Sequence, residues 1–330
     1  MLGFVYLHSE STHGLTTLIH RTRSLWLKMP SVSAFHVIAL TTILLSPILL
    51  RSSAQDTCVA SSQPNPVAQI YANFPTGTFN ATLAIIPISL ATARDIIPSR
   101  FSILESAYRA LLPNFPADMY PVLMQAGLDH DIQLAAYNIS VPDFQRFGWS
   151  FPFIDLLGDG YSSFTWAPAQ MISADHQIAI NGSRDYGTTV YATDFEPGCD
   201  AYGHLRGRAT YFRGRATDDS GIYAHLDFSP LEKGTHNPFP VEFYQNITNQ
   251  PIFGDGTQCD SQVRLFNSTI NQGEFAPVPV KGTIFSNLEP LGNMEGLGDV
   301  FGLLIDTPFV EYNGLDCASL KGYQGTGSGD

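Results

Sequence analysis

Acidic residues beside histidine, and one acidic residue at the end of an apolar run, are the first candidates for chemistry in this sequence. Asp129-His130-Asp131 offers metal ligands, but on a strand His130 would point away from the face shared by Asp129 and Asp131. Asp155 follows the apolar run Phe151-Pro-Phe-Ile, where a raised carboxyl pKa would suit proton transfer; the alternative is that it caps a turn. We therefore expect no metal site and take Asp155 as a candidate acid or base.

Other catalytic signatures are absent from the sequence. Asp175-His176 and His225-Leu-Asp227 are isolated pairs without a third ligand in sequence reach. There is no G-x-S-x-G elbow, no H-E-x-x-H, no P-loop, and no G-x-G-x-x-G after a strand. No cofactor is expected.

A five-residue repeat holds four arginines. Arg206-Gly-Arg-Ala-Thr210 recurs as Arg213-Gly-Arg-Ala-Thr217, and strand alternation would put the two arginines of each copy on one face. The repeat suits either a carboxylate-binding strip of guanidinium groups or an exposed hairpin that balances an acidic surface. We favour the hairpin.

Composition and charge indicate one globular domain that does not bind nucleic acid. The chain has 330 residues, of which 44% are hydrophobic and 14% charged. Without residues 1–54, which hold four of the cations and one of the acids, 13 cationic and 29 acidic side chains remain. Binding to a phosphate backbone needs the opposite balance.

The N-terminal residues predict export. The apolar segment 34–50 follows Arg21, Arg23 and Lys28 and precedes the small residues 52–54, as in a cleaved secretory signal that ends near Ala54. An uncleaved signal would be the only membrane attachment that we expect. Either Met1 or Met29 could be the true start.

Cysteines and glycosylation sequons agree with a secreted protein. Four cysteines without C-x-x-C spacing predict two disulfides, for which we favour Cys58 with Cys317 and Cys199 with Cys259. Five N-x-S/T sequons predict a glycoprotein, at Asn80, Asn138, Asn181, Asn246 and Asn267.

Hydrophobic periodicity predicts a mainly β protein of the α+β class. A capping box at Ser102 and Glu105 begins a predicted helix that ends at Pro113, and a shorter helical turn spans Leu90 to Ile97. Period-two alternation predicts strands over 131–140, 161–172, 188–195, 202–215, 221–228 and 262–267. The predicted organisation is a leader and signal over 1–54, a lead-in over 55–70, a single domain over 71–320 and a flexible tail over 321–330.

Residues 153–195 resemble the acetoacetate decarboxylase-like superfamily, most closely its secreted fungal-type members. Asp155 resembles the family's acidic position, Gly160-Tyr161 with Pro168 its middle segment, and Gly182-Ser-Arg-Asp-Tyr-Gly187 its Gly-Arg-Glu turn. The resemblance implies a β-barrel with antiparallel sheets and an apolar pocket. In that pocket Arg184 would hold an anionic group, and Tyr186 and Tyr191 would bind or enclose the ligand.

The lysine that does the family's chemistry is missing. The family's lysine pair falls on Val190 and Tyr191, and no lysine occurs between Lys28 and Lys233. A Schiff base needs a primary amine, for which arginine is no substitute.

Three hypotheses follow. The first is a secreted glycoprotein that binds a small carbonyl or carboxylate compound. The second is a carbon-carbon lyase whose imine lysine is Lys281 or Lys233. The third is a non-catalytic extracellular interaction protein. A closed apolar cavity without lysine would favour the first, a cavity with lysine the second, and a barrel filled by side chains the third.

Overall fold

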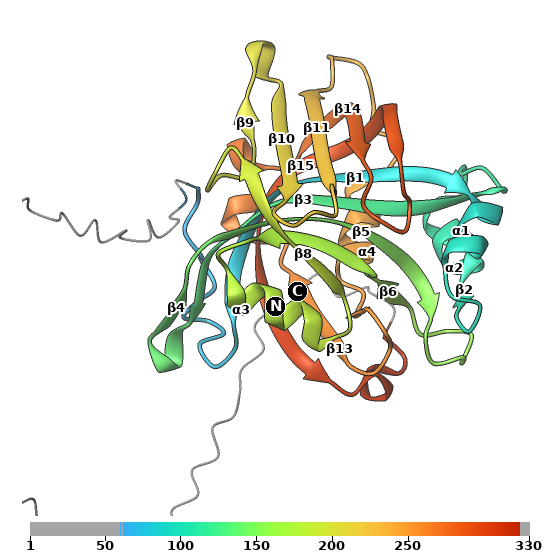
Figure 1. Ribbon diagram of the computed structural model, residues 1–330, viewed down its shortest axis with the longest axis horizontal. Coiled ribbons are helices and arrows are strands. Elements are labelled where there is room, and N and C mark those ends of the chain that lie inside the picture. The colour runs from blue at the N-terminus through green and yellow to red at the C-terminus, as the bar shows by residue number, and fades with distance from the viewer. Residues whose placement is uncertain (1–59, 61, 324–330) are drawn as a thin grey trace, which may run out of the picture. The chain divides into compact units, whose positions relative to one another are not determined.

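The computed structural model describes residue 60 and residues 62–323, which form a mainly β fold with four α-helices (Figure 1). The predicted fold class is therefore confirmed. The helices are α1 (Leu90–Ile96), α2 (Glu105–Leu111), α3 (Gln177–Asp185) and α4 (Val241–Thr248). The strands are β1 (Thr76–Ser89), β2 (Ser102–Ile103), β3 (Met119–Leu134), β4 (Ile139–Val141), β5 (Phe144–Asp155), β6 (Phe164–Trp166), β7 (Ala169–Ser173), β8 (Thr189–Glu196), β9 (Gly203–His204), β10 (Thr210–Ala216), β11 (Tyr223–Pro230), β12 (Ile252–Phe253), β13 (Cys259–Arg264), β14 (Val278–Ser286) and β15 (Met294–Leu315).

The strands belong to one 15-stranded sheet whose pairings close two rings. In the first ring, β5, β7, β8, β10, β11, β14, β15, β1 and β3 pair in that order, and β3 pairs back to β5. In the second ring, β13, β12, β6, β5, β3, β1 and β15 pair in order, and β15 pairs back to β13. The two rings share β1, β3, β5 and β15, so the fold is not a clean barrel. Most pairs are antiparallel; β7 with β8 and β12 with β6 are parallel.

The interior of the first ring is filled with large side chains. Phe147, Trp149 and Met171 are fully buried, and Phe212 on the opposite side of the ring is 1% exposed. Gly214 faces this interior, where a Cβ atom would come within 2.7 Å of the Phe195 ring. The absence of a side chain at residue 214 therefore allows the aromatic packing.

Two short helices lie between the shared strands β1 and β3 in the chain. Helix α1 begins at Ser89, whose side chain accepts a hydrogen bond from the backbone of Thr92 at 2.9 Å, and it confirms the predicted turn at Leu90 to Ile97. The predicted capping box is wrong. Ser102 belongs to β2 and pairs with Asp155, and α2 begins at Glu105 without a side-chain cap. Pairing between strands thus outweighs the local capping signal.

The packed body extends beyond the predicted 71–320 boundary in both directions. Val67 is buried against Leu265 and Val310, and the backbone N–H of Ser163 donates to the carbonyl of Tyr323 at 3.0 Å. The predicted leader and signal, residues 1–54, lie outside the described residues. Among the helices of the described part of the chain, none combines the length and apolar character that a membrane span requires.

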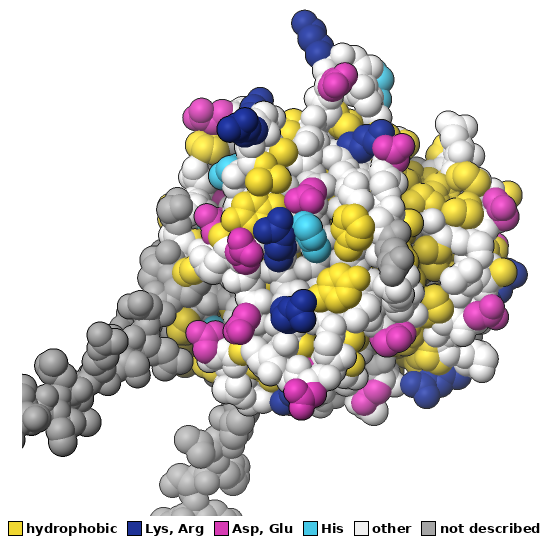
Figure 2. Space-filling model, turned by 45° about the horizontal axis from the view of Figure 1, so that its top comes forward, with side chains coloured by type: hydrophobic (Ala, Val, Ile, Leu, Met, Phe, Trp, Pro, Cys, Tyr) yellow, Lys and Arg dark blue, Asp and Glu magenta, His cyan; other side chains and the backbone are white. Residues whose placement is uncertain are grey.

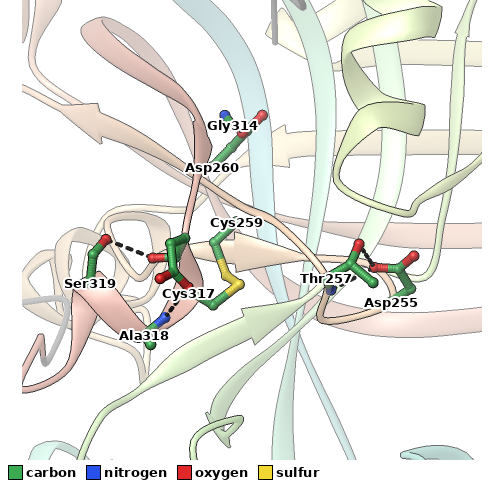
Figure 3. The surroundings of a disulfide bond; sticks show 9 residues. Asp255, Thr257, Cys259, Asp260, Gly314, Cys317, Ala318 and Ser319 are labelled. Carbon is green, nitrogen blue, oxygen red and sulfur yellow. Dashed lines mark hydrogen bonds between the residues drawn. A yellow bond between two sulfur atoms is a disulfide. The ribbon is translucent and has the colours of Figure 1, made fainter.

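A disulfide joins Cys259 to Cys317, with their Cα atoms 5.1 Å apart (Figure 3). The expected pairing of Cys199 with Cys259 and Cys58 with Cys317 is therefore wrong. Cys259 pairs in register with Leu315 across β13 and β15, which brings Cys317, just beyond the strand, within bonding distance. Cys199 is also disulfide-bonded, and Cys58 lies outside the described residues.

Candidate functional site

A row of residues in register crosses β8, β7, β5 and β3, on the face opposite Phe147 and Met171. Side chains directly opposite one another on neighbouring strands point to the same face of a sheet. Val190 on β8 pairs with Gln170 on β7, Gln170 with Gly148 on β5, and Gly148 with Gln125 on β3. Val190, the position to which the resemblance assigns the lysine, thus shares a face with the amides of Gln170 and Gln125.

Arg146 lies two residues before Gly148 on β5 and therefore on the same face as this row. It is bound by Asp129 and Gln262. Its Nε atom lies 2.7 Å from Asp129 Oδ2, and its Nη2 group donates to Asp129 Oδ1 at 3.2 Å. Nη2 also donates to Gln262 Oε1 at 3.0 Å, which links β5 to β13. Arg146 and Asp129 are 7% and 1% exposed, so this ion pair is almost dry.

A second arginine enters the same region from β13. Arg264 Nη2 donates to Gln125 Oε1 at 2.5 Å and to Gln262 Oε1 at 3.2 Å. The guanidinium carbons of Arg146 and Arg264 lie 4.3 and 4.7 Å from the centre of the Phe79 ring. We call Gln125, Asp129, Arg146, Gln262 and Arg264 the arginine cluster.

The arginine cluster has more hydrogen-bond donors than acceptors. Arg264 Nε, Arg264 Nη1 and Gln262 Nε2 are buried and have no hydrogen-bond partner among the described residues. Burial, reinforced by the neighbouring Arg146, lowers the pKa of Arg264 to about 9, while Asp129 acts in the opposite direction. Unused donors beside two cations favour a negatively charged or carbonyl-bearing guest.

A second acid lies on the same face of β13 as the arginine cluster. Asp260 precedes Gln262 by two residues and accepts a hydrogen bond from the backbone N–H of Gly314 at 2.7 Å (Figure 3). Burial and the neighbouring Glu311 raise the pKa of Asp260 to about 7. This carboxyl group therefore changes its protonation state near neutral pH.

Asp155, the predicted acid or base, caps a turn. Its two oxygens accept hydrogen bonds from the backbone N–H groups of Asp159 and Gly160, both at 3.0 Å. Those bonds occupy both oxygens of its carboxylate. The structure thus matches the capping alternative, and Asp155 does not belong to the arginine cluster.

The Asp129-His130-Asp131 run is divided between the two faces of β3, but not as alternation predicts. Asp129 binds Arg146, whereas Asp131 turns to the His130 side and places Oδ2 3.0 Å from His130 Nδ1. Asp131 has a positive φ of 49°, which breaks the regular alternation. No group of three potential metal ligands occurs among the described residues.

The residues that the family resemblance assigns to ligand binding differ in their surroundings. Arg184 is exposed at the end of α3, and its nearest polar contact is the carbonyl of Val190 at 3.5 Å. Tyr186 is fully buried, and its hydroxyl accepts a hydrogen bond from Gln170 Nε2 at 2.7 Å. Tyr191 is half-buried, and its pair partner Met171 lies inside the first ring. Tyr186 therefore contacts a side chain of the row, Gln170, whereas Arg184 contacts the backbone carbonyl of Val190.

The described lysines all lie at the surface. Lys233 and Lys321 are exposed, and the Lys281 side chain is 40% exposed with Nζ 2.6 Å from Asp299 Oδ1. An exposed, ion-paired ammonium lacks the dry surroundings that lower the pKa of an imine-forming lysine.

The five predicted glycosylation sites differ in exposure. Asn138, Asn181 and Asn267 are exposed, and Asn80 is half-buried. Asn246 is 8% exposed, and its Oδ1 accepts a hydrogen bond from Gln250 at 3.1 Å. A glycan on Asn246 would disrupt that packing, so the folded protein accommodates the other four more readily.

The arginine repeat forms part of a mixed surface. Arg206 and Arg208 lie in a short 3-10 turn, whereas Arg213 and Arg215 lie on β10. Arg213 Nε donates to His225 Nε2 at 3.3 Å, and its Nη1 lies 3.7 Å from Glu196. Figure 2 shows cationic, acidic and hydrophobic side chains intermingled on the face that it draws, rather than a cationic patch. These contacts favour the hairpin interpretation over a carboxylate-binding strip.

Comparison with known proteins gives distant structural likenesses only. No family model and no curated protein matches the chain. An acetoacetate decarboxylase-like enzyme from Sphingomonas wittichii RW1 has a TM-score of 0.39 and 9% sequence identity, over 73% of this chain and 92% of that chain. The enduracididine biosynthesis enzyme MppR complexed with pyruvate has a TM-score of 0.39 and 9% identity, over 76% and 89% of the two chains. MppR with the condensation product of pyruvate and imidazole 4-carboxaldehyde has a TM-score of 0.37 and 8% identity, over 72% and 86%. At these scores we draw no argument from the likeness.

The arginine cluster itself is absent from the sequence-based predictions. Its members come from β3, β5 and β13; the other residues of β3 and β5 are largely apolar, whereas β13 is mostly polar. The usable signal was polar residues at alternate positions of otherwise buried strands, such as Gln262 and Arg264. Their convergence depends on ring closure, which the sequence does not reveal.

Proposed function

We propose that this protein binds a small carboxylate or carbonyl compound at the arginine cluster, as a secreted glycoprotein of the acetoacetate decarboxylase-like type that lacks Schiff-base chemistry. The observation that carries the proposal is Arg264, whose buried guanidinium has two nitrogen atoms without a hydrogen-bond partner among the described residues. A carboxylate would accept hydrogen bonds from those nitrogen atoms and would compensate the positive charge of Arg264.

The proposed chemistry is binding and polarisation rather than imine formation. Arg264 and Gln262 would donate to the ligand oxygen, and Arg146, already paired with Asp129, would add positive potential. Asp260, with its pKa of about 7, would be the nearest candidate for proton exchange on β13. The described lysines are too exposed to supply a tuned amine, so we do not propose the lyase alternative with Lys281 or Lys233.

Ligand binding is tested with pyruvate, acetoacetate and acetate as probes. We expect at least one of them to raise the thermal unfolding temperature of the purified protein and to bind in titration calorimetry. Arg264→Met should weaken that binding at least tenfold, since it removes the unpartnered donors. Arg215→Met on the exposed face of β10 is the matched control and should leave binding unchanged. Equal binding by both variants would place the site elsewhere.

Secretion and N-glycosylation are a separate part of the proposal. They are supported by the apolar N-terminal segment, the sequons and the disulfide between Cys259 and Cys317. A protein released from a secreting eukaryotic host should begin near Gln55 and should gain gel mobility after deglycosylation. Recovery of residues 1–50 in the released form would exclude the cleaved signal.

A non-catalytic interaction protein is the second candidate function. The observation in its favour is the first ring, whose interior is filled by Phe147, Trp149, Met171 and Phe212. Absence of binding by all three probes, with the arginine cluster intact, would favour this candidate.

A further inference from the structure

A cavity of about 400 Å³ opens at the surface where β1, β9, β10, β14 and β15 meet. Its volume falls within the range of ~300–1,000 Å³ that small-molecule sites occupy. It shares no residue with the arginine cluster. The lining includes Asn80, Tyr202, His204, Arg208, Glu274 and Phe275.

Asn80 in the wall of this cavity belongs to the sequon Asn80-Ala81-Thr82. Its Nδ2 group donates one hydrogen bond to Ser62 Oγ at 3.2 Å. Its Oδ1 atom is buried without a hydrogen-bond partner among the described residues. An amide nitrogen carries two hydrogens, so one remains for substitution after the bond to Ser62 is made.

The chemistry of the lining suits a pyranose ring. Phe275 is 43% exposed, an unusual exposure for a phenylalanine at the edge of a cavity, and Tyr202 adds a second aromatic ring. His204, Arg208 and Glu274 have no ion-pair partner among the residues that the structure describes, and thus have donors and acceptors free for sugar hydroxyl and acetamide groups. Arg208 reaches the cavity from a backbone with a positive φ of 67°, a conformation that a bulky residue rarely adopts.

We propose that Asn80 carries an N-linked glycan whose first N-acetylglucosamine occupies this cavity. The proposal rests on the proposed passage through the secretory pathway. There the Nδ2 atom of Asn80, in the unfolded chain, would attack C1 of a lipid-linked oligosaccharide pyrophosphate. The N–C1 bond forms as the C1–O bond breaks, the lipid pyrophosphate leaves with the bonding electrons, and the amide proton passes to a base. On folding, the sugar fills the hollow and packs on Phe275.

Sequon Asn138 provides a matched control within the same molecule. Asn138 is exposed in a turn and is not among the residues that line the cavity. A glycan there would project into solvent. The two sites therefore differ in how accessible the sugar linkage should be in the native protein.

The experiment compares native and denatured deglycosylation of protein secreted from a eukaryotic host. Peptide N-glycosidase should remove the Asn138 glycan from native protein at least tenfold faster than the Asn80 glycan, and both at similar rates after denaturation, as read by glycopeptide mass spectrometry. Phe275→Ala should bring the native rate at Asn80 toward that at Asn138. An unmodified Asn80 beside an occupied Asn138, or equal native rates, would overturn the inference. Secreted protein with every sequon empty would overturn the glycoprotein proposal as well.

Discussion

The buried guanidinium of Arg264 leads to a prediction that distinguishes a binding site from a structural network: Arg264→Met should stabilise the unliganded protein. Arg264 is 2% exposed and lies beside Arg146, which forms an ion pair with Asp129. Methionine keeps an unbranched apolar chain without the charge. The substitution therefore removes a desolvated cation and a like-charge repulsion.

The magnitude follows from the pKa of Arg264 and its hydrogen bonds. A fall in pKa from 12.5 to about 9 corresponds to roughly 5 kcal/mol of disfavoured charge, at about 1.4 kcal/mol for each pKa unit. The lost bonds to Gln125 and Gln262 have a charged donor and subtract about 3 kcal/mol in total, at about 1.5 kcal/mol each. We expect the free energy of unfolding to rise by about 2 kcal/mol, as occurs when apolar side chains replace buried charges.

Urea unfolding at pH 7 measures this change. Asp129→Asn is the control of opposite sign: it leaves both arginines uncompensated and should lower the free energy of unfolding by about 3–5 kcal/mol. A loss of stability of more than about 1 kcal/mol in Arg264→Met would refute the reasoning, because it would mean that the guanidinium is a net structural contributor.

The remaining predictions concern the disulfide, two titrating groups and the lysines. Replacing Cys259 and Cys317 by alanine should lower the free energy of unfolding in urea by about 4 kcal/mol, the chain-entropy value for a 58-residue separation; a loss below about 1 kcal/mol would contradict it. Burial lowers the pKa of His130, but the carboxylates of Asp306 and Asp131 outweigh that effect and raise it above 6.5. The stabilising contribution of the protonated ring should therefore be complete below pH 6.5 and lost as pH rises through the folded-state pKa. In His130→Gln, the free energy of unfolding measured by denaturation should depend less on pH over this range. The pKa of Asp260 is raised from 3.8 to about 7, so stability should increase as pH falls through 7, and Asp260→Asn should stabilise at pH 8 but not at pH 3, as measured by thermal unfolding. Borohydride with acetoacetate should leave the protein mass unchanged, whereas a trapped adduct on any lysine would revive the lyase alternative.

The strand content could be predicted from alternation, but the pairing of distant strands could not. Strands β8, β10, β11 and β13 overlap predicted segments. The rings close through β15, which pairs with β1 and β13 over long sequence separations that leave no local signal. Helix α3 was also missed, since residues 182–187 read as a turn from their glycines and polar residues, and burial of Tyr186 stabilises the helical end.

The site could be predicted less well than the fold. For Asp155 the sequence left two interpretations, and only the backbone N–H groups of Asp159 and Gly160 decide between them. The arginine cluster escaped prediction because its members are separated by up to 139 residues, as Gln125 and Arg264 are. A local sequence pattern predicts which residues share a face of one strand, but not which residues of distant strands that face contacts.

The strands shared by the two rings, β1, β3, β5 and β15, should also govern the order in which parts of the protein unfold. Every residue of β5 is buried, because one face of the strand contacts the aromatic interior and the other the arginine cluster. Strands β10 and β11, by contrast, present one face to solvent. Amide hydrogens of β3 and β5 should therefore exchange with deuterium only when both rings come apart together, whereas those of β10 and β11 should exchange through partial opening of the first ring. The two rings would thus unfold as one cooperative unit, and β10 and β11 would form a less protected segment of the first ring.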